Sequence, residues 1–375
     1  MADKLKTNGA LWDFEGFRKE GGLARGLPGF AYSDQAFWRH ETESLFQSSW
    51  VFAGFVHELS RPGDVVPVAV GGRPVVLVRD KQGTIRAFHN VCRHRCLKLV
   101  DKPGNAGAMI RCPYHAWSYS FDGQLRATPY FGGPENRPPD GFAAENHGLR
   151  PVRSAIWHDW IFVNLDGAAA ELSDYVAPLA RRMEGIDFAK LVPVATLDFG
   201  EVRTNWKFLM ENFIEPYHVQ FVHKTTTDQP LLDHYTVVDG PCVGSAVDIT
   251  KSKNDARVQQ NALAVTSRYL TLFPNFIIGV YEPDQIGVYL NVPLDAERTL
   301  QKRAIYTLNG KGLSDPEAEA LKSLWWAVHK EDHEMCERLQ EGRRSEVSAD
   351  GGVLSPHWEN SVRCFQQLVV DAVTR

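Results

Sequence analysis

Two short segments of the chain each pair one cysteine with one histidine, Cys92 with His94 and Cys112 with His115. Two cysteines and two histidines can hold either a tetrahedral zinc ion or a 2Fe–2S cluster in which the cysteines bind one iron and the histidines the other. Structural zinc sites usually keep ligands of one kind together, as Cys-x₂₋₄-Cys and His-x₃₋₅-His. Each half here mixes the two kinds, which favours the cluster over zinc.

A second candidate site is the segment ENFIEPYHVQFVH, residues 211–223, which holds Glu215, His218 and His223. Glu215 and His218 are three apart and would share one face of a helix. His223 would lie about 140° round the helix from His218, so one metal ion can reach both rings only if the helix widens or ends between them. Pro216 also disfavours a regular helix. The segment therefore indicates either a metal site or two unrelated core histidines.

The composition excludes several classes of protein. The 375 residues are 43% apolar and 23% charged, which is typical of a globular chain of one or two domains. A net charge of −5 argues against a nucleic-acid or membrane-surface partner. No run of 18 apolar residues and no secretory signal is present, and six cysteines in so long a chain do not form a disulfide framework. These features predict a cytoplasmic protein without a membrane span.

The elements that must position the two sites follow from periodicity and turn residues. Residues 33–49 open with a Ser/Asp cap and have helical periodicity. Residues 50–163 are short β-branched or aromatic runs, with hairpin turns at KQG and FDGQ, and they indicate a small all-β unit. A β-rich stretch at 236–307 and a long helix near 315–342 follow. The chain is therefore predicted to be α+β, with an all-β domain preceding an α+β domain.

The helix near 315–342 supplies a carboxylate that could complete the second site. Asp332 lies about 20° from the centre of its apolar stripe and Glu331 about 80° from it. The stripe consists of Leu321, Leu324, Trp325, Val328, Met335, Cys336 and Leu339. A carboxylate that points into a core is costly unless a cation or metal meets it. Asp332 is therefore the candidate third ligand; the alternative pairs it with Arg338, and Asp228 and Asp233 are weaker candidates from a polar loop.

At this point the chain resembles a known family, the Rieske non-haem iron oxygenases of the ring-hydroxylating alpha-subunit type. AFHNVCRHRC and RCPYHAWSYSFDGQLRATP resemble its two cluster-binding boxes, and NWKFLMENFIEPYHVQFVH resembles its mononuclear-iron box. The resemblance covers essentially residues 40–345. Respiratory-chain Rieske proteins carry an additional cysteine in each box, whereas Tyr114 stands in the second box here, so Cys96 is expected to be an unpaired thiol.

The resemblance implies a fold and two metal centres. A Rieske domain at 46–163 would hold the 2Fe–2S cluster, and residues 1–45 and 164–375 would form a catalytic domain with a central antiparallel sheet flanked by helices. Mononuclear Fe(II) would be bound by a facial triad of two histidines and one carboxylate, His218, His223 and Asp332.

The resemblance also implies the roles of the remaining residues and partners. Glu215 would carry electrons between the cluster of one subunit and the iron of the next, in a head-to-tail homotrimer, and Asn212 would belong to the catalytic residues. A separate NAD(P)H-dependent reductase, with or without a ferredoxin, would supply electrons for O₂ activation. The chain itself shows no GxGxxG after a strand and no Walker loop, so it has no visible nucleotide site of its own.

The expected substrate is a small organic molecule that is hydroxylated, or oxidatively N-dealkylated or cleaved. Glu215 stands where the family usually has Asp, and this departure, with the C-terminal GGVLSPHWENSVRCFQQLV, resembles the branch that acts on quaternary ammonium compounds such as choline and carnitine. Aromatic side chains could cage such a cation or stack an aromatic substrate, which is the alternative. The candidates are Tyr269, Phe273, Phe276, Tyr281 and Tyr289. A zinc-binding scaffold and a simple electron carrier are the non-oxygenase alternatives.

Overall fold

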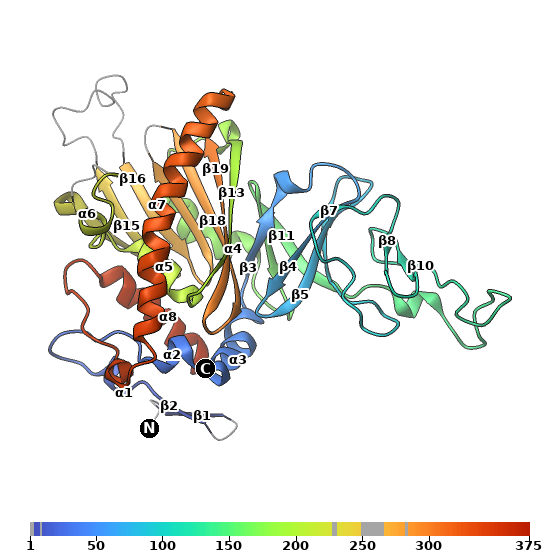
Figure 1. The fold of residues 1–375 in the computed structure, drawn as a ribbon, viewed down its shortest axis with the longest axis horizontal. Coiled ribbons are helices and arrows are strands. Elements are labelled where there is room, and N and C mark those ends of the chain that lie inside the picture. The colour runs from blue at the N-terminus through green and yellow to red at the C-terminus, as the bar shows by residue number, and fades with distance from the viewer. Residues whose placement is uncertain (1–3, 8–9, 227–230, 249–265, 282–283) are drawn as a thin grey trace. The chain divides into compact units, whose positions relative to one another are not determined.

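The structure is a computed structural model that describes residues 4–7, 10–226, 231–248, 266–281 and 284–375. It divides into two compact units, one of residues 46–172 and one of residues 1–45 and 173–375. The smaller unit is all-β and the larger unit is α+β, as the sequence predicts (Figure 1). The predicted all-β domain ended at residue 163, whereas the compact unit continues to Leu172.

The unit of residues 46–172 consists of short antiparallel strands. Seven form one sheet in the order β3-β12-β11-β6-β5-β4-β7, and three form a second sheet in the order β10-β9-β8. The strands are β3 (Val51–Phe55), β4 (Asp64–Val70), β5 (Arg73–Arg79), β6 (Ile85–His89), β7 (Gly104–Asn105), β8 (Ile110–Arg111), β9 (Ser118–Tyr119), β10 (Leu125–Ala127), β11 (Pro151–Trp157) and β12 (Trp160–Asn164). Short 3₁₀ turns lie at Val56–Glu58 and Ala144–His147.

Turn residues decide where these strands end. The predicted turns at KQG and FDGQ are confirmed, joining β5 to β6 and β9 to β10, and Gly83 and Gly123 there have φ of 85° and 88°. The apolar run IWHDWIFVNL, one of the β-branched or aromatic runs of residues 50–163, is divided between two strands, β11 and β12. The chain reverses at His158, with φ 56°, and Trp157 pairs with Trp160 across a hairpin. Apolar character alone could not reveal a reversal within a continuous aromatic run.

The larger unit contains a seven-stranded antiparallel sheet in the order β13-β19-β18-β17-β16-β15-β14. The strands are β13 (Val192–Val202), β14 (His234–Asp239), β15 (Cys242–Asp248), β16 (Thr266–Leu272), β17 (Phe276–Tyr281), β18 (Gln285–Asp295) and β19 (Arg298–Thr307). Strands β17 to β19 are buried almost throughout, as expected of a sheet covered by helices. The predicted β-rich stretch thus forms the centre of this unit.

Helices pack on this sheet and carry the second candidate site. Helix α5 contacts β15, β16 and β18 as well as α7 and α8, and Figure 1 shows the long α7 running across one face of the sheet. The helices are α1 (Glu15–Arg18), α2 (Phe30–Ser33), α3 (Gln35–Glu41), α4 (Leu172–Arg182), α5 (Trp206–Ile214), α6 (Val219–Val222), α7 (Asp315–Gly342) and α8 (Asn360–Val373). A β1–β2 hairpin (Lys4–Thr7, Ala10–Asp13) precedes them, and 3₁₀ turns lie at Phe188–Lys190, Leu231–Asp233 and Glu346–Asp350.

The predicted helix at residues 33–49 is present as α3, which continues directly into a π-helical turn. Asp34 caps α3 by accepting from the backbone N–H groups of Ala36 and Phe37, and a π-helical turn at Thr42–Phe46 follows. This region packs within the larger unit: Tyr32 stacks on Phe208 of α5 with ring centroids 4.2 Å apart.

Helix α7 has the predicted bounds, but its buried face is rotated from the predicted stripe. Ser314 and Glu317 form a capping box at its start. Leu324 and Leu339, assigned to the stripe, are 44% and 46% exposed. The buried residues are His329, Cys336 and Gln340. The helix presents a polar and histidine-bearing face to the unit's interior, which an apolar count could not locate. Among the described residues, no helix has the length and apolar character needed to cross a membrane.

Candidate active site

The two Cys/His segments of the smaller unit fold into matching turns. The backbone N–H of Cys92 donates to Leu97 and that of Cys112 donates to Trp117, both at 2.8 Å. The carbonyl of each cysteine then accepts from the residue four positions on, Cys96 or Ala116, at 3.1 and 3.0 Å. Cys96 and Ala116 both adopt a left-handed φ of 57°. Two turns of the same shape thus present a cysteine and a histidine each.

The four side chains converge on one place. Both cysteines are buried. Burial raises the pKa of Cys92, and the nearby Cys112 thiol raises it further. The rings of His94 and His115 lie 4.7 Å apart, and Nδ1 of His115 is buried without a hydrogen-bond partner. The donor set that a Rieske cluster requires is therefore present. It consists of two adjacent thiols and two imidazoles, one of which has an unsatisfied nitrogen.

Tyr119 contacts the turn that carries Cys92. Its hydroxyl lies 3.3 Å from Sγ of Cys92 and accepts from the backbone N–H of Arg93 at 2.9 Å. The ring of His94 stacks on Trp117, with centroids 4.9 Å apart and planes at 10°. Cys96 is an exposed free thiol, as expected from its lack of a partner cysteine.

In the larger unit the helix ends before the histidines, as a shared metal requires. Helix α5 stops at Ile214 because Glu215, which precedes Pro216, is extended with φ −106° and ψ 135°. His218 and His223 then flank the four-residue helix α6 as its N-cap and C-cap. Their rings come within 5.3 Å of each other.

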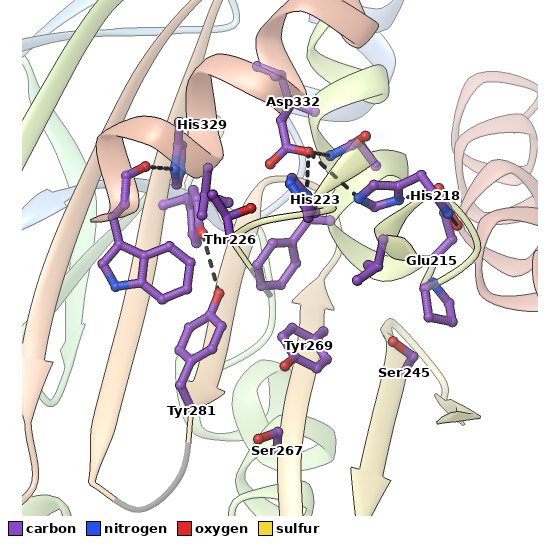
Figure 2. A pocket seen from close by; sticks show the side chains of 18 of the residues that line it. Glu215, His218, His223, Thr226, Ser245, Ser267, Tyr269, Tyr281, His329 and Asp332 are labelled. Atoms are coloured by element: carbon purple, nitrogen blue, oxygen red, sulfur yellow. Dashed lines mark hydrogen bonds and ion pairs between the residues drawn. The ribbon is translucent and has the colours of Figure 1, made fainter. Parts of the chain in front are cut away.

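Asp332 of α7 completes the group (Figure 2). Its Oδ1 lies 3.0 Å from Nε2 of His223 and 3.6 Å from Nε2 of His218. One ligand atom from each of these three residues lies within 4.8 Å of the others, so the group fits a mononuclear iron site of the two-histidine, one-carboxylate type. Nδ2 of Asn212 donates to the same Oδ1 at 3.0 Å.

The outer nitrogen of each histidine is held by a separate carboxylate. Nδ1 of His218 donates to Glu215 at 2.6 Å, and Nδ1 of His223 donates to Glu331 at 2.8 Å. Thr226 also donates to the same oxygen of Glu331, at 2.8 Å. Such partners fix the tautomer and direct Nε2 toward the metal position. Glu331, which the helix angle placed farther from the stripe centre than Asp332, thus holds His223 and lies outside the three-residue group.

The electrostatics of the group agree with ligation. Burial alone would raise the pKa of Asp332, but the hydrogen bond from His223 and the charges of both histidines lower it to about 2. Burial opposes protonation of His218, yet Glu215 and Asp332 raise its pKa to about 9. The alternative pairing of Asp332 with Arg338 is wrong, because Arg338 lies beside Glu334 instead. Asp233 is exposed and outside the group, and Asp228 falls outside the described residues.

A pocket of about 290 Å³ opens onto this group, bounded by α5, α7 and the sheet. Five aromatic residues line it, namely Phe213, Tyr269, Tyr281, Tyr289 and Trp325. Phe273 and Phe276 were also expected there, and this is wrong, since both are buried away from the lining.

Three polar side chains of the lining have buried atoms without a hydrogen-bond partner. The side chains are His234, Ser267 and His329. The unpartnered atoms are the two ring nitrogens of His234, Oγ of Ser267 and Nε2 of His329. In Figure 2, Ser267 and Tyr269 lie on the sheet, apart from the His218–His223–Asp332 group. Neither His234 nor Ser267 was singled out from the sequence, where nothing in their spacing distinguishes them.

Comparison with known protein families identifies both units. Residues 186–375 match the catalytic domain of ring hydroxylating alpha subunits, and residues 49–137 match the Rieske 2Fe–2S domain. The chain belongs to the ring-hydroxylating alpha subunits. It is a Rieske non-haem iron oxygenase, an oxidoreductase. This membership excludes the zinc-binding scaffold and the simple electron carrier as alternatives.

Several relatives of this oxygenase have named activities. A carnitine monooxygenase oxygenase subunit from Acinetobacter pittii is 28% identical over 361 residues, which are 92% of this chain and 93% of the relative. The chloroplastic choline monooxygenase of Atriplex hortensis is 26% identical over 335 residues, 88% of this chain and 74% of that protein. A crystal structure of a quaternary ammonium Rieske monooxygenase with a bound inhibitor has a TM-score of 0.80 at 25% identity, covering 93% of this chain and 96% of that chain.

Proposed function

We propose that this oxygenase hydroxylates, or oxidatively N-dealkylates or cleaves, a small organic substrate in the pocket beside His218, His223 and Asp332. Electrons would come from a separate NAD(P)H-dependent reductase, with or without a ferredoxin, through the Rieske cluster held by Cys92, His94, Cys112 and His115. A mononuclear iron with open coordination positions supplies O₂ activation when bound. The observation that carries the proposal is the convergence of the three ligand atoms within 4.8 Å at the wall of an aromatic pocket.

The surrounding residues have distinct tasks in this proposal. Glu215 and Glu331 hold the N–H of the two histidines, so that each Nε2 lone pair points inward. Asn212 donates to Asp332 and restricts the rotation of its carboxylate. The rings of Tyr269, Tyr281 and Trp325 displace water from the space that a substrate would occupy.

Glu215 is further proposed to connect two subunits. One of its oxygens accepts from His218, and the other accepts from backbone N–H groups of Tyr217 and His218. A carboxylate has about four lone-pair positions, so Glu215 retains capacity for a cluster histidine of a neighbouring copy. A head-to-tail homotrimer would provide that neighbour.

Two substrate classes are compatible with this chemistry. Quaternary ammonium compounds are favoured by the relatives, whose names refer to carnitine and choline. Aromatic compounds are the alternative, compatible with the ring-lined pocket. The two classes differ in charge, so the charge of the pocket wall distinguishes them.

Replacing Asp332 with Ala tests the proposed iron site. We expect the variant to lose mononuclear iron and substrate-dependent O₂ uptake while keeping the Rieske absorption spectrum, because the cluster ligands belong to the other unit. Glu334→Ala is the matched control, since it removes an exposed carboxylate from the same helix. Iron content by elemental analysis and O₂ uptake with a surrogate reductase are the measurements. Retention of iron and of turnover by Asp332→Ala contradicts the proposal.

A further inference from the structure

An arginine side chain is buried beneath the aromatic lining of the pocket. Arg303 of β19 is fully buried, and its Cζ lies 3.3 Å from the ring centroid of Trp325. The same atom lies 5.1 Å from the ring centroid of Tyr281 and 4.8 Å from that of Tyr289. All three rings line the pocket. The guanidinium therefore occupies the centre of an aromatic box within the range of cation–π attraction.

The sheet is built to accommodate this side chain. On β18, a Cβ atom at Gly287 would lie 2.5 Å from Nη2 of Arg303 and 2.8 Å from its Cζ. Any larger residue at Gly287 would displace the guanidinium, so the absence of a side chain there creates its space. Tyr289, opposite Arg303 in the β18–β19 register, accepts from Nη1 at 2.5 Å. The location of the charge is thus determined by the backbone on one side and by Trp325 on the other.

This positive charge has no anionic partner among the described residues. Nε and Nη2 of Arg303 are buried without a hydrogen-bond partner, and no described carboxylate forms an ion pair with it. The guanidinium of an arginine carries a positive charge in proteins. Its effect extends to the pocket lining: burial first, and then the charge of Arg303, lowers the pKa of His329.

An aromatic box of this kind is the arrangement that binds quaternary ammonium groups. Here the box already contains a cation that belongs to the protein. A second cation beside the same rings would be repelled across a short, poorly solvated distance. The acids that line the pocket, Glu215 and Asp332, are both engaged by histidines. Neither acid forms an ion pair with Arg303, and both are committed to the histidines of the proposed iron site.

We propose that Arg303 is a specificity-determining residue that excludes cationic groups from the aromatic end of the pocket and reserves it for a neutral or anionic substrate group. This inference rests on the proposed oxygenase function, and it favours the aromatic class over the quaternary ammonium class. It assigns Trp325, Tyr281 and Tyr289 to stacking on an uncharged ring rather than to caging a cation.

Binding of probe molecules of matched shape tests the proposal without requiring turnover. The first series carries a cation, a neutral group or an anion on the same ring, as benzylammonium, benzyl alcohol and benzoate. The second series compares a quaternary ammonium group with its uncharged isostere, as choline and 3,3-dimethylbutan-1-ol. Affinities are measured by calorimetry on the metal-loaded holoenzyme under anaerobic conditions. We expect each cation to bind at least about tenfold more weakly than its neutral counterpart, and benzoate to bind at least as well as the alcohol.

Variants of Arg303 identify the source of this discrimination. Arg303→Met, which fills the same space without charge, should reduce the preference against both cations by about tenfold, whereas Arg303→Lys should retain it. Lys302→Met is the matched control, because it removes a charge from the adjacent residue, which faces the other side of the sheet. Comparing each variant with wild type cancels any direct binding of benzoate to a metal. If Arg303→Met does not fold, the wild-type series still decides the question.

The outcomes separate this inference from the proposed function. Choline binding to wild type as tightly as its isostere, or an unchanged preference in Arg303→Met, overturns the role of Arg303. A benzoate affinity as poor as that of benzylammonium also overturns it, because the wild-type enzyme would then reject charge of either sign. Failure of the proposed function would give a different result. Asp332→Ala would then keep both its iron and its O₂ uptake, while the binding preferences persist.

Discussion

At the scale of single residues, the two histidines of the His218–His223–Asp332 group are both oriented by a carboxylate, but the two carboxylates come from different parts of the chain. His218 is oriented by Glu215, three residues earlier in the chain. His223 is oriented by Glu331, which is remote in sequence and lies on α7 beside Asp332. The local pair could be predicted from spacing alone, whereas the remote pair depends on how α7 packs against α5. Both carboxylates hold histidines, but only Glu215 is proposed to connect subunits.

Glu215→Gln should separate these two tasks. The amide is nearly isosteric, so we expect folding, cluster and iron to be retained, but it cannot accept N–H bonds from two imidazoles and carry the supporting charge. Activity should fall by at least about tenfold. In a single-turnover experiment with pre-reduced enzyme, the cluster should stay reduced while the iron site remains loaded. Glu331→Gln is the control: it should weaken iron binding without blocking cluster oxidation in the molecules that retain iron. Wild-type rates in Glu215→Gln would show that Glu215 has no bridging role.

The unpartnered hydroxyl of Ser267 leads to a prediction about stability. Its Oγ is buried at the pocket without a hydrogen-bond partner, so it carries a desolvation cost that a substrate group could offset. Ser267→Ala should therefore leave the free energy of unfolding of the substrate-free chain unchanged or raise it by about 1 kcal/mol. Ser361→Ala, which removes a buried hydroxyl that donates to Ile214 at 3.0 Å, should lower it by about 1 kcal/mol. Urea unfolding measures both, and equal destabilisation of the two variants would contradict this reasoning.

At the scale of elements, the sequence predicted what depends on short spacing. The hairpin turns, the break near Pro216 and the bounds of α7 follow from local residue types, and the structure has them. The buried face of α7 was misplaced because Leu324 and Leu339 are exposed while His329 faces inward. An apolar count cannot recognise a helix whose inner face serves a polar site.

Helix α5 carries a buried acid that should make stability depend on pH. Burial raises the pKa of Glu211 to about 7, despite hydrogen bonds from Tyr32 and Gln366. Between its ordinary pKa of 4.5 and about 7 the folded chain holds a proton that the unfolded chain has lost. The stabilisation is therefore complete below about pH 4.5 and disappears as the pH rises through about 7.

Glu211→Gln should remove this dependence. We expect the difference in urea-unfolding free energy between pH 5 and pH 8 to become smaller in the variant, by up to roughly 3 kcal/mol. At pH 8 the variant should be more stable than wild type, because no charge is then buried. Glu319→Gln, an exposed acid of α7, is the control and should leave the pH profile as in wild type. An unchanged profile in Glu211→Gln would mean that another group titrates in this range.

At the scale of the whole molecule, the two metal-binding groups belong to separate compact units. Each could be predicted because its ligands lie close together in sequence, apart from Asp332. The environment of Arg303 could not be predicted. Its charge acquires a role only because the strand register and α7 bring Gly287 and Trp325 to the same place. Nothing in the strand sequence RTLQKRAIYT indicates that contact.

The proposed transfer of electrons between subunits gives the last prediction, a test by complementation. His115→Ala should lose the Rieske spectrum and keep the iron group, while His223→Ala should lose mononuclear iron and keep the spectrum, because the two ligands belong to different units. Each homotrimer should be inactive. Trimers that contain both chains, isolated by two different tags after co-expression, should recover about one third of wild-type activity. In a head-to-tail ring of three, one junction pairs an intact iron group with an intact cluster. Trimers of one variant carrying both tags are the control. If electrons instead passed within a chain, no mixed trimer would be active, since every chain lacks one of the two centres.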